Sequence, residues 1–188
     1  MRRISSSERY DQKNQLLAKL KEQNVLVYPT DTVYGIGCDA TNKEAVKHVR
    51  NAKQGPDKPM SVIAPSHEWI TKHFHVDQAV QDALENLPGP YTYILRVKQR
   101  GVADNVAPEK NSVGIRRPDH WITSLVERLG KPLVTTSANI SGEPTANTIN
   151  DLPEAFTEHV DVAIDEGRIK GSASTIIDYS GDEPERVR

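Results

Sequence analysis

Cysteine, aromatic residues and long apolar runs are all scarce in this chain of 188 residues. Cys38 is the only cysteine, so a disulfide within the chain and a cluster of thiolate metal ligands are both excluded, which favours a reducing, intracellular setting. Aromatic residues make up 5% of the chain, which argues against a platform for stacking single-stranded bases. The longest apolar runs span only a few residues, whereas a membrane-spanning helix needs roughly 20, so we expect no membrane contact.

An excess of either charge is also missing. The 24 Lys and Arg residues oppose 26 Asp and Glu residues, which gives a formal net charge of −2 and a pI of about 6.3. No overall positive field attracts polyanions, so any nucleic-acid binding has to come from a local patch. The N-terminal stretch MRRISSSERYDQKNQ is basic but has no apolar core, unlike a secretory signal. We therefore expect a cytoplasmic protein.

Helix and strand patterns alternate along the chain, whose 36% hydrophobic and 27% charged residues suit one compact domain. Capping boxes at Ser5-x-x-Glu8 and Thr41-x-x-Glu44 mark the starts of two helices, and Gly130 ends another. The expected helices cover 5–23, 41–53, 66–74, 77–87, 120–130 and 151–159, and the expected strands cover 25–28, 59–64, 91–97, 112–116, 131–136, 160–165 and 173–178. About seven strands with helices between them predict an α/β fold with a mixed sheet wrapped by helices. The last ten residues, YSGDEPERVR, are expected to be a frayed polar tail.

Polar, glycine-containing loops follow four of the expected strands, after Tyr28, Ile115, Val134 and Ile164. Loops at strand ends can line one common cleft. The site candidates all come from these loops or from the turn that follows the second expected helix.

The first candidate is the stretch VLVYPTDTVYGIGCDA. Thr30, Asp31 and Thr32 offer hydroxyls and a carboxylate, while Gly35 and Gly37 allow close approach of the backbone. This combination suits a small polar ligand. An ordinary exit from a strand, with Thr30 capping its own turn, explains the pattern equally well.

The second candidate is the basic turn NAKQGPDKPMS. Lys53 and Lys58 bracket Gly55-Pro56-Asp57, and their ammonium groups can hold phosphate oxygens as point charges. Arg50 lies three residues before Lys53 and so shares its helix face. The alternative is a solvated helix end whose lysines complement the helix dipole.

The third candidate is the pair Arg116-Arg117 in NSVGIRRPDHW. Neighbours on a strand point to opposite faces, so only one of the two can enter a given cleft, where it could hold a carboxylate through paired hydrogen bonds. The alternative is a surface ion pair with Asp119, which contributes little.

The fourth candidate is the stretch LVTTSANISGEPTANT, in which an apolar strand runs into small hydrogen-bonding residues. It lacks the G-x-S-x-G of a nucleophile elbow, and no histidine is tied to Ser137 by a known spacing, so a loop that binds polar ligand atoms is favoured over a hydrolase. The later stretch DEGRIKGSASTIID is a weaker signal of the same kind. We expect no metal site within the chain, because H-x-x-x-H and H-E-x-x-H are absent, and neither Walker A nor G-x-G-x-x-G occurs.

Together these stretches resemble one family. YPTDTVYGIG, K-x-x-x-x-K-P at 53–59, SVGIRRPDH and TTSANISGEP, followed by GSASTIID, occur in the order seen in the YrdC/TsaC family, and the resemblance runs from about Asn24 to Tyr179. It implies a YrdC-like α/β fold, a twisted mixed sheet wrapped by helices with a large concave cleft. It also implies a single domain over 1–188, with its core at about 12–180 and a polar tail over 180–188.

The resemblance further implies L-threonylcarbamoyladenylate synthase activity. Such enzymes combine L-threonine, bicarbonate and ATP, which brings Mg²⁺, into threonylcarbamoyl-AMP and pyrophosphate. The product goes to a downstream threonylcarbamoyl-transferase complex for modification of tRNA. Two alternatives stay open: a module that binds tRNA or double-stranded RNA without catalysis, and a carbamoyl-transfer domain of the kind found in larger, related maturation proteins.

Matching positions in the family motifs carry over as implied site residues. Lys53 faces the carbamate and phosphate and is the implied catalytic residue. L-threonine and the carbamate are implied to contact Thr32, Arg116 and Ser137, with Thr30 and Asp31 in the same pocket. ATP is implied to contact Lys53, Lys58, Ser112, Asn139, Asn147 and Thr175. Cys38 is not expected to be essential, because the chemistry needs no covalent nucleophile.

One position departs from the family pattern. Gly55 stands where the family usually has an arginine, and the turn is about one residue shorter. A cation is therefore missing where phosphate charge has to be neutralised. Arg50 or Arg117 could replace it; the alternative is that the departure weakens the activity.

Overall fold

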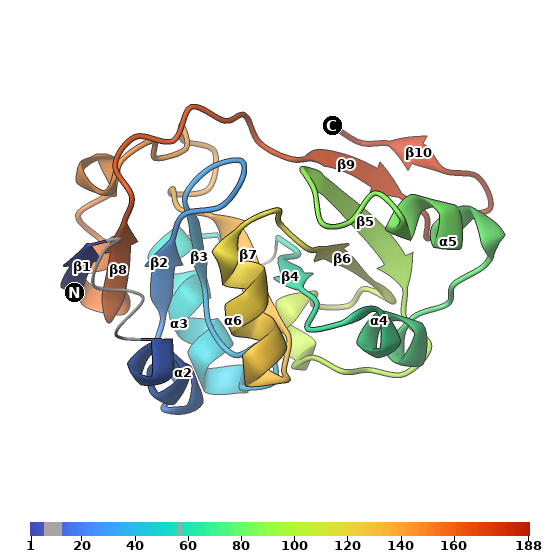
Figure 1. Cartoon of the computed structure of the whole chain (residues 1–188), viewed down its shortest axis with the longest axis horizontal. Coiled ribbons are helices and arrows are strands. Elements are labelled where there is room, and N and C mark those ends of the chain that lie inside the picture. Colours follow the sequence, from blue (N-terminus) through green and yellow to red (C-terminus); the bar gives the residue numbers. More distant parts are fainter. Residues whose placement is uncertain (6–12, 56–57) are drawn as a thin grey trace.

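A single mixed sheet organises the chain, which the computed structural model describes over residues 1–5, 13–55 and 58–188. Glu8 of the first expected capping box, and Pro56 and Asp57 of the basic turn, lie outside these ranges. The described strands run across the sheet in the order β1-β8-β2-β3-β7-β4-β6-β5-β9-β10 (Figure 1). Their bounds are β1 Arg2–Ser5, β2 Leu26–Tyr28, β3 Gly35–Gly37, β4 Ser61–Ile63, β5 Tyr91–Arg96, β6 Ser112–Arg116, β7 Leu133–Ser137, β8 Val162–Asp165, β9 Thr175–Asp178 and β10 Glu185–Arg186.

Parallel and antiparallel neighbours both occur, so the predicted mixed sheet is confirmed. The pairs β1–β8, β2–β8, β4–β6 and β5–β9 are parallel, and the others are antiparallel. The helices are α2 Lys13–Lys21, α3 Lys43–Lys53, α4 His67–His73, α5 Gln78–Leu84, α6 Trp121–Leu129 and α7 Phe156–His159, with short 3₁₀ turns η1 Asp104–Val106 and η2 Ile149–Asp151. In the described ranges, no helix is long and apolar enough to pass through a membrane.

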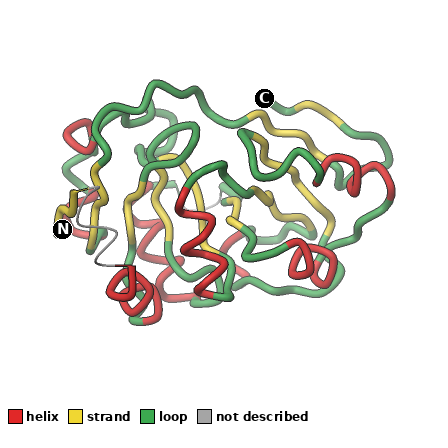
Figure 2. The backbone as a smooth tube through the Cα atoms, viewed as in Figure 1, coloured by secondary structure: helices red, strands yellow, loops and turns green. Residues whose placement is uncertain are grey.

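Alternating side chains divide the core between the two faces of the sheet. Leu26 and Tyr28 of β2 join the apolar cluster built by α2 and α6, whereas Val27 joins the cluster built by α3, α4 and α5. Figure 1 shows α2 and α6 in front of the sheet and α3 behind it, and Figure 2 shows the loops that link these layers. Helices therefore cover both faces, which leaves the loops at the strand ends to form a site.

Three strands were not predicted. Residues 2–5, assigned in part to a helix, form β1 beside β8 and bury Ile4. Gly35–Gly37 form β3, although glycine is a poor strand former, because β3 is hydrogen-bonded between β2 and β7. A Cβ on Gly37 would lie 1.7 Å from the carbonyl oxygen of Val134, so only glycine fits there.

The predicted frayed tail is wrong. Glu185–Arg186 form β10, which pairs antiparallel with β9, and the backbone of Arg188 exchanges hydrogen bonds with Ile176. The edge of the sheet thus extends almost to the last residue, because main-chain pairing does not depend on apolar side chains.

Two predicted helix boundaries also need correction. Asn42, not Thr41, caps α3: its side chain accepts hydrogen bonds from the backbone N–H groups of Glu44 and Ala45, while the Thr41 hydroxyl donates to Asp39. The single helix expected over 151–159 is replaced by η2 and α7 on either side of Pro153. Proline disrupts a helix interior because it has no backbone N–H to donate and its ring clashes with the preceding turn.

Candidate active site

Two adjoining pockets open where the predicted loops meet. The arginine pocket, of about 210 Å³, is lined among others by Thr30, Thr32, Thr92, Arg116 and Ser174. The lysine pocket, of about 240 Å³, is lined among others by Arg50, Lys53, Lys58, Asn139 and Ser141. Both share a wall made of Pro59, Thr136, Ser137 and Arg188. The predicted convergence of the strand-end loops is therefore what the structure has.

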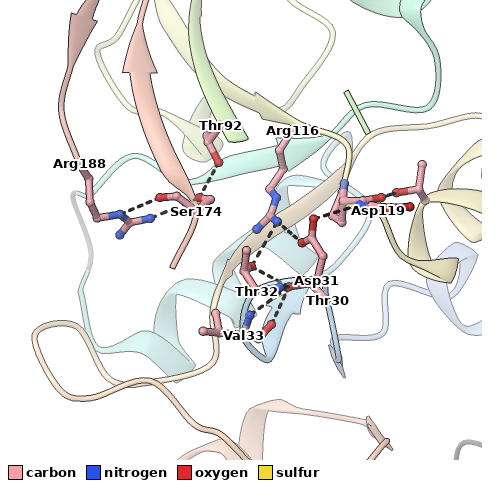
Figure 3. A network of polar contacts seen from close by, with 11 residues as sticks. Thr30, Asp31, Thr32, Val33, Thr92, Arg116, Asp119, Ser174 and Arg188 are labelled. Carbon is pink, nitrogen blue, oxygen red and sulfur yellow. Dashed lines mark hydrogen bonds and ion pairs between the residues drawn. The ribbon is translucent and has the colours of Figure 1, made fainter. Parts of the chain in front are cut away.

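The turn after β2 is held together by Thr30. Its hydroxyl donates to the carbonyl of Val33 at 2.7 Å and accepts from the backbone N–H groups of Thr32 and Val33. It also lies 2.9 Å from the Thr32 hydroxyl (Figure 3). Thr30 thus does cap its own turn, and the result is that the Thr32 hydroxyl is fixed at the pocket wall.

Arg116 reaches the pocket from the end of β6 and is 7% exposed. Its Nη2 donates to Asp31 Oδ1 at 2.7 Å and to Thr32 Oγ1 at 3.3 Å, while the backbone N–H of Asp119 donates to Asp31 Oδ2 at 3.0 Å (Figure 3). Burial raises the pKa of the Asp31 carboxyl, which Arg116 and the Asp119 N–H oppose. Among the described residues, Nε of Arg116 has no hydrogen-bond partner although it is buried. Arg116 as a residue lines the pocket, so its guanidinium offers a cation to a ligand there.

Arg117 points the other way, as strand alternation predicts. It pairs with Glu127 of α6 and lines neither pocket. The ion pair considered between these arginines and Asp119 is not what the structure shows, since Arg116 pairs with Asp31 and Arg117 with Glu127.

Lys53 ties the end of α3 to the loop after β7. Its Nζ donates to the carbonyl oxygens of Ser137 at 2.6 Å and Asn139 at 2.9 Å. Burial, together with the nearby charge of Lys58, lowers its pKa to about 8. The Asn139 amide in turn donates to the carbonyls of Ile140 and Glu143, which shapes the loop around the ammonium group.

The departure at Gly55 has a steric reason. A Cβ on Gly55 would lie 2.3 Å from Ser141 Oγ and 2.9 Å from Ser141 Cβ, so this position has no room for a side chain. The same loop is fixed by a hydrogen bond from the Ser141 N–H to the Lys53 carbonyl. An arginine at position 55 would therefore require the neighbouring loop at Ser141 to move.

Arg188 and Ser174 are wall residues that sequence reasoning missed. Arg188 Nε donates to the Ser174 carbonyl at 3.1 Å, and the Ser174 hydroxyl lies 2.9 Å from that of Thr92 (Figure 3). Alternation along the ASTIID strand was a usable signal, because it puts Ser174 and Ile176 on one face and Thr175 on the other. The local sequence around Arg188 does not predict its position, because the pairing of β10 with β9 is what brings it to the pockets.

The implied site residues divide into two groups. Thr30, Thr32, Arg50, Lys53, Lys58, Arg116, Ser137 and Asn139 line one or both pockets. Asp31, Ser112, Asn147 and Thr175 are not among the wall residues: Asp31 lies behind Arg116, and Asn147 is bonded through its backbone to Asp151 and Ile169. The wall residues of the described chain include no side-chain carboxylate.

Comparison with known proteins assigns the family. The Sua5/YciO/YrdC family model, described as telomere recombination, matches residues 18–188. The chain belongs to the Sua5/YciO/YrdC family. It is 34% identical over 163 residues to a threonylcarbamoyl-AMP synthase of Vibrio campbellii, covering 84% of this chain and 87% of that one. It is 35% identical over 185 residues to a putative threonylcarbamoyl-AMP synthase of Methanocaldococcus jannaschii, covering 95% and 87%.

Solved structures of Sua5/YciO/YrdC proteins share the fold. P. abyssi Sua5 complexed with L-threonine superposes with a TM-score of 0.88 at 26% identity, over all of this chain but only 56% of that one. E. coli YciO superposes with a TM-score of 0.86 at 26% identity, over 100% of this chain and 93% of that one. The chain thus spans little more than half of that Sua5 and nearly all of YciO.

Proposed function

We propose that this chain is a threonylcarbamoyl-AMP synthase, which joins L-threonine, bicarbonate and ATP and releases pyrophosphate. The observation that carries the proposal is the shared wall at Ser137, which sets the pocket of Arg116 beside a pocket lined by several cations. The names of the curated relatives, and L-threonine in the Sua5 complex, support the same activity.

L-threonine is assigned to the arginine pocket. Its carboxylate accepts hydrogen bonds from Arg116, whose Nη2 is held by Asp31. The Thr32 hydroxyl and Ser137 supply polar contacts on either side. The amine of the substrate then points toward the shared wall, where bicarbonate converts it to a carbamate with loss of water.

ATP is assigned to the lysine pocket. Lys53, Lys58 and Arg188 neutralise phosphate charge, and the loop at Asn139 faces the nucleotide. Mg²⁺ enters as part of the Mg–ATP substrate, held through phosphate oxygens, because the described pocket walls offer no side-chain carboxylate to bind it.

The reaction depends on alignment rather than on a covalent nucleophile. A carbamate oxygen attacks the α-phosphorus, a new P–O bond forms, and the bond to the leaving pyrophosphate breaks. Placing the two substrates in adjoining pockets makes the attack effectively intramolecular, and fixed cations stabilise the charge on the phosphate groups. Lys53 sits at the junction, with its ammonium group 2.6 Å from the Ser137 carbonyl.

The fate of the product follows from its chemistry. A mixed anhydride of a carbamate and AMP is labile, so we propose that a threonylcarbamoyl-transferase complex takes it up for tRNA modification. A cytoplasmic location fits this use.

Pyrophosphate release tests the proposal. ATP, Mg²⁺, L-threonine and bicarbonate are supplied together and then omitted one at a time, with L-serine as the matched amino acid. We expect release that requires every component and is slower with L-serine. Nucleotide binding without release, accompanied by steeply salt-dependent binding of RNA, would replace the synthase with the non-catalytic RNA-binding module.

A further inference from the structure

Arg50 is a buried cation on α3, one turn before Lys53, and is 8% exposed. It borders the lysine pocket and was considered above as a replacement for the arginine missing at position 55. Its contacts indicate that it positions the backbone rather than binding phosphate.

The guanidinium of Arg50 holds backbone carbonyls from two segments. Nε donates to the Asn105 carbonyl at 2.6 Å, Nη2 to the Val106 carbonyl at 3.2 Å, and Nη1 to the Lys58 carbonyl at 3.1 Å. The Val106 carbonyl also accepts from the N–H of Met60 at 2.9 Å. Arg50 therefore joins the turn η1 to both the helix and the returning basic turn.

These contacts of Arg50 hold the backbone of Lys58 in place. The Lys58 side chain is exposed at the pocket, and within the described parts of the chain its ammonium group has no hydrogen-bond or ion-pair partner. A lysine side chain is flexible, so where its ammonium group can reach depends on where its backbone is held. The hydrogen bond from Arg50 Nη1 to the Lys58 carbonyl is a side-chain contact that holds this backbone in the described part of the chain.

We infer that Arg50 is a positioning residue: it fixes the backbone at Lys58 so that the Lys58 ammonium group meets the nucleotide phosphates, and it does not contact the nucleotide itself. The inference rests on the proposed function. It differs from direct phosphate binding because three of the five N–H groups of Arg50, one on each nitrogen, are already directed at carbonyl oxygens of the protein.

A double-mutant cycle with Lys58 separates the two roles. Arg50→Lys keeps the positive charge but cannot span three carbonyls. We expect it to raise the KM for ATP about tenfold, the typical effect of losing one ordered charge-assisted hydrogen bond, with kcat and the KM for L-threonine within about twofold of wild type. In a Lys58→Ala background the same substitution should change the KM for ATP no further, because residues that act through one another are not additive.

Additive losses in the two variants would overturn the inference in favour of direct contact by Arg50. Lys47→Ala removes an exposed cation from the same helix and is the matched control, expected to leave both KM values unchanged. If Arg50→Lys fails to fold, as judged by its melting transition, Arg50→Gln enters the cycle instead. If the wild type releases no pyrophosphate, the proposed function fails, and the cycle is repeated on the dissociation constant of Mg–ATP, where a lack of coupling still overturns the positioning role.

Discussion

Arg116 and Asp31 form an ion pair of 2.7 Å between the end of β6 and the turn after β2, with side chains only 8% and 12% exposed. The two residues lie 85 positions apart in the chain. The pair therefore fixes the orientation of the pocket arginine and, at the same time, joins two distant segments of the sheet.

Asp31→Ala is expected to destabilise the fold. Removing one partner of a buried pair leaves the other charge uncompensated, which typically costs about 3–5 kcal/mol. Urea denaturation measures the free energy of unfolding. Asp119→Ala is the control, because Asp119 is exposed and its hydrogen bond to Asp31 comes from the backbone N–H, which the substitution keeps. A loss under about 1 kcal/mol for Asp31→Ala would contradict a buried, stabilising pair.

Arg116→Gln is expected to impair binding of L-threonine. Loss of a charge-assisted contact to a carboxylate corresponds to roughly 3 kcal/mol, so the KM for L-threonine should rise about a hundredfold. The adjacent Arg117→Gln is the matched control, because Arg117 directly follows β6, pairs with Glu127 away from both pockets and should leave this KM near the wild-type value. Equal effects of the two variants would remove Arg116 from the amino-acid site.

The pH dependence of activity reports on Lys53. Its pKa of about 8 means that the folded protein loses this cation as pH rises through 8, so kcat/KM for ATP should fall there. Because the nearby charge of Lys58 contributes to the lowered pKa, Lys58→Ala should move the falling limb to higher pH, and Lys47→Ala should not move it.

Deprotonation of Lys53 lowers activity as pH rises, but it raises the free energy of unfolding over the same pH range. Between pH about 8 and the ordinary value of 10.5, the unfolded chain holds a proton on Lys53 that the folded protein has released, so this group makes stability rise with pH.

The activity prediction has its own contrary outcome. If Lys58→Ala leaves the fall of kcat/KM for ATP at the same pH as in the wild type, a group other than Lys53 controls the activity.

Gly55→Ala is expected to reduce activity and stability by crowding Ser141. Overpacking of this kind typically costs about 1–3 kcal/mol. The double variant Gly55→Ala with Ser141→Gly should recover much of the loss, since it removes both atoms that the new methyl group meets. Gly181→Ala, whose new Cβ would lie 3.9 Å from the Glu183 carbonyl oxygen, is the control in thermal melts and activity assays. Failure of the second substitution to rescue the first would refute the steric account.

Arg188→Gln is expected to weaken both substrates. The residue lines both pockets, so the KM for ATP and the KM for L-threonine should rise together, by about tenfold each if one charge-assisted contact is lost per site. Arg168→Gln, an exposed cation that lines neither pocket, provides the control. A change in only one KM would place Arg188 at a single substrate.

The predictable parts of this protein were those governed by local rules. Strand alternation correctly predicted that Arg116 and Arg117 point to opposite faces. The small-residue loops correctly indicated where the pockets lie. The missed parts depend on distant partners: β3 exists because β7 pairs with it, and β10 because β9 does. Gly55 could be seen as unusual from the sequence, yet its reason, the side chain of Ser141, is visible only in three dimensions.

The two-residue strand β10 links the site to the rim of the sheet. The N–H groups of Val187 and Arg188 both donate to the Ile176 carbonyl, and Ile176 itself lines the arginine pocket. Short edge strands open locally at low free-energy cost, and ligands oppose any opening that destroys their site. Fraying of this edge and release of the bound substrate are therefore coupled equilibria. Occupancy of the pockets should slow amide hydrogen exchange along β9 and β10.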